Sequence, residues 1–154
     1  MNKEIGDYVC KIDDFIVLPD AVNCIRLAKE KGFLAIVITN QGGIDKGLYS
    51  REDLNSFHQK LQDECLKNGT RIDDFYYCAH HPTVGKCLCR KPDSSMIERA
   101  MAKYNIDPEN SLMIGDTERD MEAATKAGVK SLLVQPNSEK LRLLQNEIEL
   151  IIIK

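Results

Sequence analysis

The chain has few of the features that mark membrane, secreted or nucleic-acid-binding proteins. It contains no long run of basic residues, and its formal net charge is -3, so binding to nucleic acid is not expected. Residues 1–11 are polar and mixed in charge, without the apolar segment of a signal peptide. The apolar tail, residues 150–153, is far too short to span a bilayer. We therefore expect a cytoplasmic protein that binds neither nucleic acid nor membrane.

Internal repeats, low-complexity tracts and interdomain linkers are also missing. The sequence has 154 residues, of which 43% are hydrophobic and 29% charged. This composition is typical of one globular domain with its own core. We expect a single domain over residues 1–154, in which the apolar tail forms a terminal strand or a core anchor.

Six cysteines are present, but their spacing does not favour a disulfide framework. Three of them fall within the twelve residues 78–89, and the chain shows no secretory signal. A metal site in a cytoplasmic protein is therefore the better interpretation. The other three, Cys10, Cys24 and Cys65, are interpreted as small, partly buried hydrophobic side chains.

Helical and strand patterns alternate along the chain. Helices are expected over residues 19–31, 50–68, 93–104 and 118–127, with a last helix beyond residue 134; strands are expected over 34–39, 72–77, 111–114 and 131–134. Ser50, with Asp53 three residues later, has the pattern of a capping box. Strands separated by helices predict an α/β fold, a doubly wound, Rossmann-like parallel sheet with helices on both faces.

A dense Cys/His segment lies between the second expected strand and the third helix. Cys78 and His80 form one Cys-x-His pair, and Cys87 and Cys89 form a Cys-x-Cys pair after a loop long enough to fold back. Zinc favours four tetrahedral sulfur and nitrogen ligands, so these four are the predicted ligands. His81 would point away from its neighbour and is left out. Four protein ligands close the site, which predicts structural zinc; free reduced cysteines on a loop are the alternative.

Polar residues fall at the carboxyl ends of the expected strands, where parallel sheets of this type bind ligands. The Thr39 hydroxyl, the Asn40 amide and nearby backbone amides could hold a phosphate oxygen. Lys91 could neutralise a phosphoryl group. Asp116 is a hard oxygen ligand suited to magnesium, and Asp120 could orient it or cap the next helix. A plain turn, a solvated charge pair and a helix cap are the structural alternatives for these features.

Together these segments resemble the haloacid-dehalogenase (HAD) superfamily of phosphatases. The matching strings are Thr39-Asn40-Gln41-Gly42-Gly43-Ile44, Tyr77-Cys78-Ala79-His80-His81-Pro82, Cys87-Leu88-Cys89-Arg90-Lys91-Pro92 and Gly115-Asp116-x-x-x-Asp120. Within the superfamily the chain is most similar to the heptose bisphosphate phosphatases and the related histidinol-phosphatases, because the zinc loop is peculiar to that branch. The His-His-Pro string and residues 7–15 look more like the heptose enzymes.

The resemblance implies a role for each matching residue. Thr39 would bind the transferring phosphoryl group, Lys91 would stabilise its charge, and Asp116 would bind magnesium. The substrate would also contact Tyr8, Asn40, Gln41, Gly42 and Arg90. The implied activity is that of a magnesium-dependent phosphoric monoester hydrolase of carbohydrate metabolism. Its substrate would be a sugar bisphosphate, most like D-glycero-D-manno-heptose 1,7-bisphosphate cleaved at position 7, with histidinol phosphate as the alternative.

Two departures from the family pattern stand out. The first family motif is Asp-x-Asp-Gly-Thr, whose first aspartate would be the nucleophile and whose second would be the general acid and base. No Asp-x-Asp follows an apolar strand in this sequence, and Asp13 and Asp14 are adjacent instead. At Thr117 the heptose enzymes commonly carry a basic residue that helps to hold phosphate. We therefore expect an N-terminally truncated, inactive domain; a non-catalytic zinc-bearing module that binds phosphate or a partner is the alternative.

The missing motif also has a consequence for the sheet. In this superfamily the first strand lies centrally, between the strands that end at Thr39 and Asp116. Its loss would leave unpaired backbone on both neighbours, which favours self-association through exposed sheet edges. We expect a gap, a direct pairing of the two neighbours, or a replacement strand. The tail, residues 149–153, and a strand from a second copy are the candidates for that replacement.

Overall fold

The computed structural model describes residues 1–2, 8–134 and 151–153. Its centre is one parallel sheet with the strand order β2-β1-β5-β3-β4. The strands are β1 (Ala35–Asn40), β2 (Asp74–Cys78), β3 (Leu112–Gly115), β4 (Lys130–Leu133) and β5 (Ile151–Ile153). The predicted parallel α/β sheet is confirmed.

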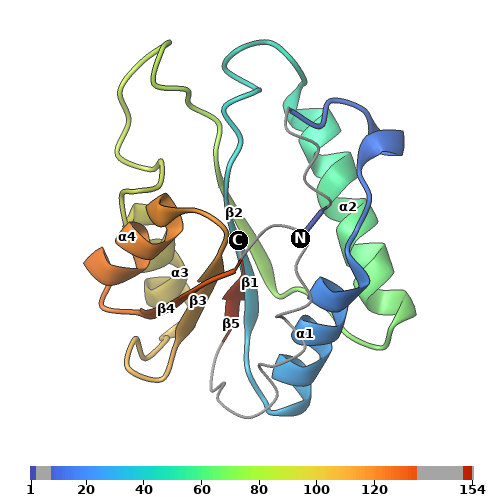
Figure 1. The fold of residues 1–154 in the computed structure, drawn as a ribbon, viewed down its shortest axis with the longest axis vertical. Coiled ribbons are helices and arrows are strands. Elements are labelled where there is room, and N and C mark those ends of the chain that lie inside the picture. The colour runs from blue at the N-terminus through green and yellow to red at the C-terminus, as the bar shows by residue number, and fades with distance from the viewer. Residues whose placement is uncertain (3–7, 135–150, 154) are drawn as a thin grey trace.

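Helices cover both faces of this sheet. Figure 1 shows α1 (Pro19–Glu30) and α2 (Arg51–Lys67) on one face, and α3 (Ser95–Tyr104) and α4 (Glu118–Lys126) on the other. A short helix, η1 (Ile12–Asp14), packs near α2. Alternate residues of β1 point to opposite faces, so Val37 joins the core beneath α1 and α2, while Ile36 and Ile38 join the core beneath α3 and α4.

Two capping boxes fix the starts of helices. The Ser50 hydroxyl accepts the backbone N–H of Asp53, whose carboxylate accepts the backbone N–H of Ser50, as predicted. Thr117 and Asp120 form the same pair at the start of α4. Each box satisfies backbone donors that a helix start leaves free. Asp120 therefore does cap its helix, which was one of its two predicted roles.

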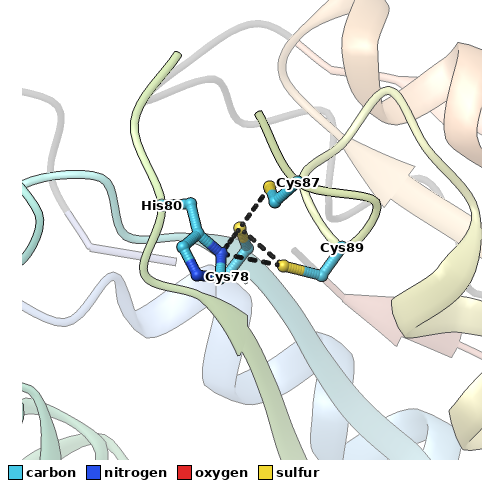
Figure 2. Close-up of side chains that lie close together, drawn as sticks. All are labelled: Cys78, His80, Cys87 and Cys89. Carbon is cyan, nitrogen blue, oxygen red and sulfur yellow. Dashed lines mark hydrogen bonds between the residues drawn. The ribbon is translucent and has the colours of Figure 1, made fainter. Parts of the chain in front are cut away.

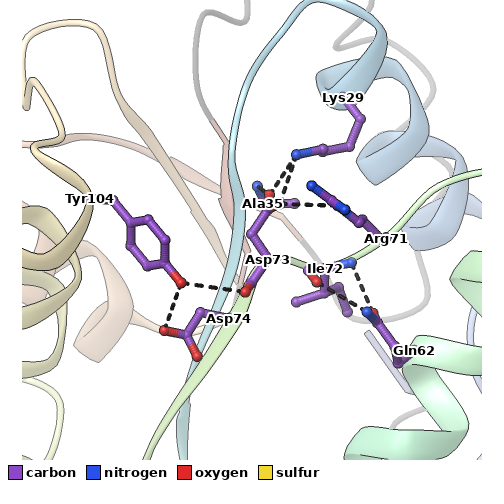
Figure 3. Close-up of polar contacts among 8 residues, drawn as sticks. All are labelled: Lys29, Ala35, Gln62, Arg71, Ile72, Asp73, Asp74 and Tyr104. Atoms are coloured by element: carbon purple, nitrogen blue, oxygen red, sulfur yellow. Dashed lines mark hydrogen bonds and ion pairs between the residues drawn. The ribbon is translucent and has the colours of Figure 1, made fainter.

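The amino ends of β1 and β2 are held by polar side chains (Figure 3). The Asp73 carboxylate accepts the backbone N–H of Ala35 at 2.8 Å and the Lys29 ammonium at 2.7 Å. The Gln62 side chain pairs with both backbone groups of Ile72, at 2.9 and 3.1 Å. Because Ile72 is bonded to a helix in this way, β2 begins at Asp74 instead of residue 72.

The central position of the sheet is taken by β5. This strand pairs with Ala35–Val37 of β1 and with Leu112–Ile114 of β3, and it is parallel to both. The apolar tail, one of the two candidates for a replacement strand, therefore fills the place between the neighbours, and neither a gap nor a direct β1–β3 pairing forms. The last helix expected beyond residue 134 lies outside the described residues.

In the described part of the chain, no helix has the length and apolar character that crossing a membrane requires.

Candidate functional site

A cavity of about 200 Å³ lies at the carboxyl edge of the sheet. It is bounded by Thr39 and Asn40 at the end of β1 and by Asp116, which directly follows β3. Gln41 and Tyr8 line it as well. The structure thus gathers five of the predicted site residues around one space. Asp116 is the only carboxylate among the described residues that line this cavity.

The Thr39 hydroxyl is oriented by a chain of hydrogen bonds. The Gln41 side-chain amide donates to Thr39 Oγ1 at 3.1 Å, and the Tyr49 hydroxyl donates to Gln41 Oε1 at 2.5 Å. Burial raises the pKa of Tyr49 to about 12, so its hydroxyl remains a donor at neutral pH. Since Thr39 Oγ1 accepts from Gln41, the hydroxyl hydrogen of Thr39 is directed elsewhere. Sequence reasoning missed Tyr49, because a tyrosine in a loop carries no local signal of this contact.

Asn40 fastens the end of β1 to the segment after the Cys/His loop. Its amide nitrogen donates to the backbone oxygen of Lys91 at 3.0 Å, and its amide oxygen accepts the backbone N–H of Lys91 at 3.0 Å. This reciprocal pair uses both ends of the Asn40 side chain. Asn40 therefore positions Lys91 and also lines the cavity.

Lys91 is buried, with an exposure of only 1%. Its ammonium lies 2.6 Å from the carboxylate of Asp120, which is also 1% exposed, and donates to the backbone oxygen of Ile38 at 2.6 Å. A Cβ on Gly115 would lie 2.3 Å from Cβ of Asp120, so glycine is required there for Asp120 to approach. The predicted charge stabiliser thus sits between β1 and α4, and it is not among the residues that line the cavity.

Arg90 lies against the turn that follows β1. Its guanidinium donates to the backbone oxygen of His80 at 2.9 Å. A Cβ on Gly42 would lie 2.9 Å from Cδ2 of His81 and 3.2 Å from Nη1 of Arg90, so the close approach requires glycine. Arg90 lines a second cavity, of about 580 Å³, together with Lys86 and Arg119. Arg90, which was predicted to contact the substrate, therefore lines the second cavity and not the first.

The four predicted zinc ligands form one cluster, shown in Figure 2. Sγ of Cys78 lies 3.6 Å from Nδ1 of His80, 3.6 Å from Sγ of Cys87 and 3.0 Å from Sγ of Cys89. All four ligand atoms lie within 4.8 Å of one another. Zinc–sulfur bonds of about 2.3 Å would put tetrahedral ligands about 3.8 Å apart, so the cluster fits one such ion.

His81, which the sequence analysis left out of the ligand set, lies outside the cluster. Its Nδ1 pairs with the Thr83 hydroxyl at 2.7 Å, and its backbone N–H donates to the Asp45 carboxylate at 2.9 Å. These contacts hold the loop in place near the turn that follows β1.

His58 is a second cavity residue that sequence reasoning missed. It comes from α2, and its ring stacks on Phe75 with 4.3 Å between centroids. Its Nε2 is buried without a hydrogen-bond partner among the described residues. Burial lowers its pKa to about 4, so the ring is neutral at pH 7.

Comparisons with known sequences point to one family. Residues 88–150 match the family described as HAD-hyrolase-like. The chain is 35% identical over 130 residues to D-glycero-beta-D-manno-heptose-1,7-bisphosphate 7-phosphatase of Haemophilus ducreyi, covering 80% of this chain and 71% of that protein. It is 39% identical over 131 residues to the corresponding Helicobacter pylori protein (strain 26695), covering 83% and 75%.

Solved structures agree with the sequence comparisons. D,D-heptose 1,7-bisphosphate phosphatase from B. bronchiseptica, complexed with magnesium and phosphate, superposes with a TM-score of 0.83 at 29% identity, covering 99% of this chain and 86% of that one. A HAD-like phosphatase from Mesorhizobium loti gives a TM-score of 0.81 at 26% identity, covering 91% and 77%. The fold, the strand-end residues and the sequence identity lead to one assignment: the chain belongs to the D-glycero-D-manno-heptose-1,7-bisphosphate 7-phosphatase family of HAD-like hydrolases.

Proposed function

We propose that this chain carries the residues that bind phosphate and magnesium in a magnesium-dependent phosphatase that acts on a sugar bisphosphate. The favoured substrate is D-glycero-D-manno-heptose 1,7-bisphosphate, cleaved at position 7, as the names of the relatives indicate. The observation that carries the proposal is that Thr39 and Asp116 lie at the carboxyl ends of two strands of one sheet and line the same cavity. Histidinol phosphate, the alternative substrate, has no support among the relatives reported above.

Thr39 would bind the phosphate. Its oxygen accepts from Gln41, so its hydroxyl hydrogen can be donated to a phosphate oxygen. Gln41 is itself held by Tyr49, which fixes the direction of that hydrogen. Tyr8 forms another wall of the cavity, and its ring lies under the Lys46 ammonium, 5.0 Å from the ring centroid. Lys46 thereby places a positive charge near this wall.

Asp116 would hold the magnesium ion. Magnesium is commonly bound by one or two carboxylates, with water and substrate phosphate completing its octahedron. A single carboxylate beside a phosphate-binding hydroxyl fits this pattern, although with one protein anion the affinity would be weak. The bound ion would neutralise charge on the phosphate. Lys91 would stabilise the charge of the phosphoryl group, as the resemblance implies, and its ammonium is held behind the site by Asp120 and the backbone oxygen of Ile38.

Catalysis needs a nucleophile that the sequence does not supply. The sequence has no Asp-x-Asp, and Asp116 is the only carboxylate among the described residues of the cavity. We therefore infer that these residues bind phosphate without hydrolysing phosphate monoesters at this site. A non-catalytic phosphate-binding module remains the second candidate function, and the same observation favours it.

The Cys/His cluster would hold structural zinc through Cys78, His80, Cys87 and Cys89. The proximity of its four ligand atoms supports this assignment. The ion would fix the loop that precedes Arg90 and Lys91, because Cys89 is the residue before them. Zinc bound by four protein ligands has no open position for substrate, so its role would be structural.

Phosphate binding tests the proposal directly. Inorganic phosphate should bind the chain in the presence of magnesium, measured by isothermal titration calorimetry. Thr39→Val keeps the shape of the side chain and removes the hydroxyl, so the affinity should fall about tenfold, as expected for one lost hydrogen bond to a charged group. Thr39→Ser keeps the hydroxyl and is the matched control. If the valine variant binds phosphate as well as the unmodified chain, the proposed site is wrong.

A further inference from the structure

β2 forms one edge of the sheet, and among the described residues it pairs with β1 alone. At the end of β2, the backbone oxygen of Cys78 accepts the backbone N–H of Gln41 at 2.7 Å. A strand directs the backbone groups of every second residue to the same neighbour, so those of Phe75 and Tyr77 face away from β1. The Phe75 N–H accordingly bonds to the Asp74 carboxylate at 2.8 Å. The outer side of β2 can therefore accept a further strand.

A cavity of about 560 Å³ follows this edge. It is lined by four consecutive residues of β2, Asp74–Tyr77, and it reaches His80 of the Cys/His cluster. Helix α2 contributes Arg51 on one face of the sheet, and α3 contributes Arg99 and Lys103 on the other. In the described part of the chain, this cavity shares no lining residue with the 200 Å³ cavity. The edge of β2 is thus separate from the proposed phosphate site.

Two arginines flank the edge, one on each face of the sheet. The Arg51 guanidinium donates to the Tyr77 hydroxyl at 3.2 Å, and the Arg99 guanidinium lies over the Tyr76 ring, 5.7 Å from its centroid. Tyr76 and Tyr77 are neighbours in a strand, so their side chains point to opposite faces; accordingly, they pack against different core clusters. Both arginines are exposed, and neither forms an ion pair within the described residues.

The other charges at this edge are already paired. The Lys103 ammonium lies 2.7 Å from the Asp74 carboxylate, which also accepts the Tyr104 hydroxyl at 3.1 Å (Figure 3). Asp74 is the only carboxylate among the described residues that line this cavity. Arg51 and Arg99 therefore give the edge a positive charge that complements an acidic partner. Because side chains of an added strand alternate between faces, carboxylates on two adjacent residues would each reach one arginine.

We propose that the outer edge of β2 is a docking site for an extended segment of another protein that carries two adjacent acidic residues. The segment would form a strand beside β2 through the backbone groups of Phe75 and Tyr77. Its two carboxylates would pair with Arg51 and Arg99. Docking uses none of the residues proposed to bind phosphate or magnesium, so it can be tested independently of the proposed phosphatase.

The probe is a fluorescein-labelled peptide, Thr-Val-Thr-Glu-Asp-Val-Thr-Val, whose binding to the full chain is measured by fluorescence anisotropy. The control peptide, Thr-Val-Glu-Thr-Asp-Val-Thr-Val, has the same composition and charge, but both of its acidic side chains lie on one face of a strand. The first peptide should bind about fivefold more tightly, because it forms one more exposed ion pair. Equal affinities of the two peptides would contradict the proposed spacing of the acidic residues.

Substitution of each arginine tests the charge pairing. Arg51→Gln and Arg99→Gln should each weaken binding of the first peptide about fivefold. Arg26→Gln removes the same charge from α1, away from this edge, and should leave the affinity unchanged. Arginine variants that bind the peptide normally and instead self-associate would show that the arginines only protect the edge from aggregation, and the docking site would be wrong.

Hydrogen exchange locates the bound peptide. The first peptide should slow exchange of the Tyr77 N–H and leave β4, at the opposite edge of the sheet, unchanged. Absence of saturable binding, or protection of β4 in place of Tyr77, would overturn the proposal. Protection of Tyr77 that increases with protein concentration in the absence of peptide would also overturn it, because a second copy of this chain would then cover the edge.

Discussion

Removing the charge of Asp120 should strongly destabilise the fold. Lys91 and Asp120 are each 1% exposed, and their charged atoms lie 2.6 Å apart. Taking away one member of such a pair leaves the other charge buried without its counter-ion, which costs about 3–5 kcal/mol of unfolding free energy. A domain of this size has about 5–15 kcal/mol in total. The ammonium of Lys91 would keep the backbone oxygen of Ile38, so we expect the lower part of that range, about 3 kcal/mol.

The variant Asp120→Asn isolates the charge from the helix cap. Its side-chain oxygen can still accept the backbone N–H of Thr117, the contact that Asp120 makes at 3.0 Å. Asp120→Ala loses both functions, and a lost cap costs about 1 kcal/mol more. Urea unfolding followed by circular dichroism measures both values. Lys91→Met with Asp120→Leu removes both charges together and should be less destabilised than either single variant.

A small loss of stability in Asp120→Asn would contradict a buried ion pair between Lys91 and Asp120. If Asp120→Asn loses less than about 1 kcal/mol, the pair is not behaving as a buried ion pair. If the double variant is as unstable as the two single losses added together, then the two side chains act independently. In that case Lys91 would be held in place mainly by Ile38 and by the contact of its backbone with Asn40.

Freshly purified, reduced protein should carry close to one zinc ion per chain by elemental analysis, and Cys87→Ser should lower that content; absence of zinc in the unmodified protein would contradict the assignment. Burial of His58 depresses its pKa to about 4. As the pH drops from about 6.5 to about 4, the histidine is therefore protonated in the unfolded chain but still neutral in the folded one. The free energy of unfolding should fall over this range by about 2 kcal/mol after solvent screening. His58→Phe should remove that part of the pH dependence, and an unchanged pH profile would show that burial of His58 is not its cause. Ser50→Ala should cost about 1 kcal/mol in urea unfolding through loss of the α2 cap, whereas Ser50→Thr should cost much less.

Local sequence patterns were sufficient to predict most of the fold. Alternation of apolar strands with amphipathic helices gave the parallel sheet, because both patterns follow from local periodicity. The Ser50 cap and the grouping of Cys78, His80, Cys87 and Cys89 also depend on residues close together in the chain. Where a strand end was misplaced, a distant side chain was the cause: Gln62 binds the backbone of Ile72 and delays the start of β2.

Contacts between distant segments could not be predicted in the same way. The run of isoleucines in the tail indicates a strand by its β-propensity, but nothing local selects the slot between β1 and β3. The burial of Lys91 likewise depends on Asp120, which lies 29 residues away in the sequence. Tyr49 and His58 reach the cavity only because the fold places a loop and α2 beside β1.

Contacts in the structure connect the proposed zinc cluster to the proposed phosphate site, which the cluster does not contact. Cys89 belongs to the Cys/His cluster, and two residues later Lys91 is bonded through its backbone to both ends of the Asn40 amide. Asn40 is the neighbour of Thr39, whose hydroxyl is oriented from the other side by Gln41. Cys78, another member of the cluster, is the last residue of β2 and pairs with Asn40. A loop freed by metal loss would therefore loosen both Lys91 and the last residue pair of β1 and β2. The cluster is therefore expected to govern the placement of Lys91 and the ends of β1 and β2 at the carboxyl edge of the sheet.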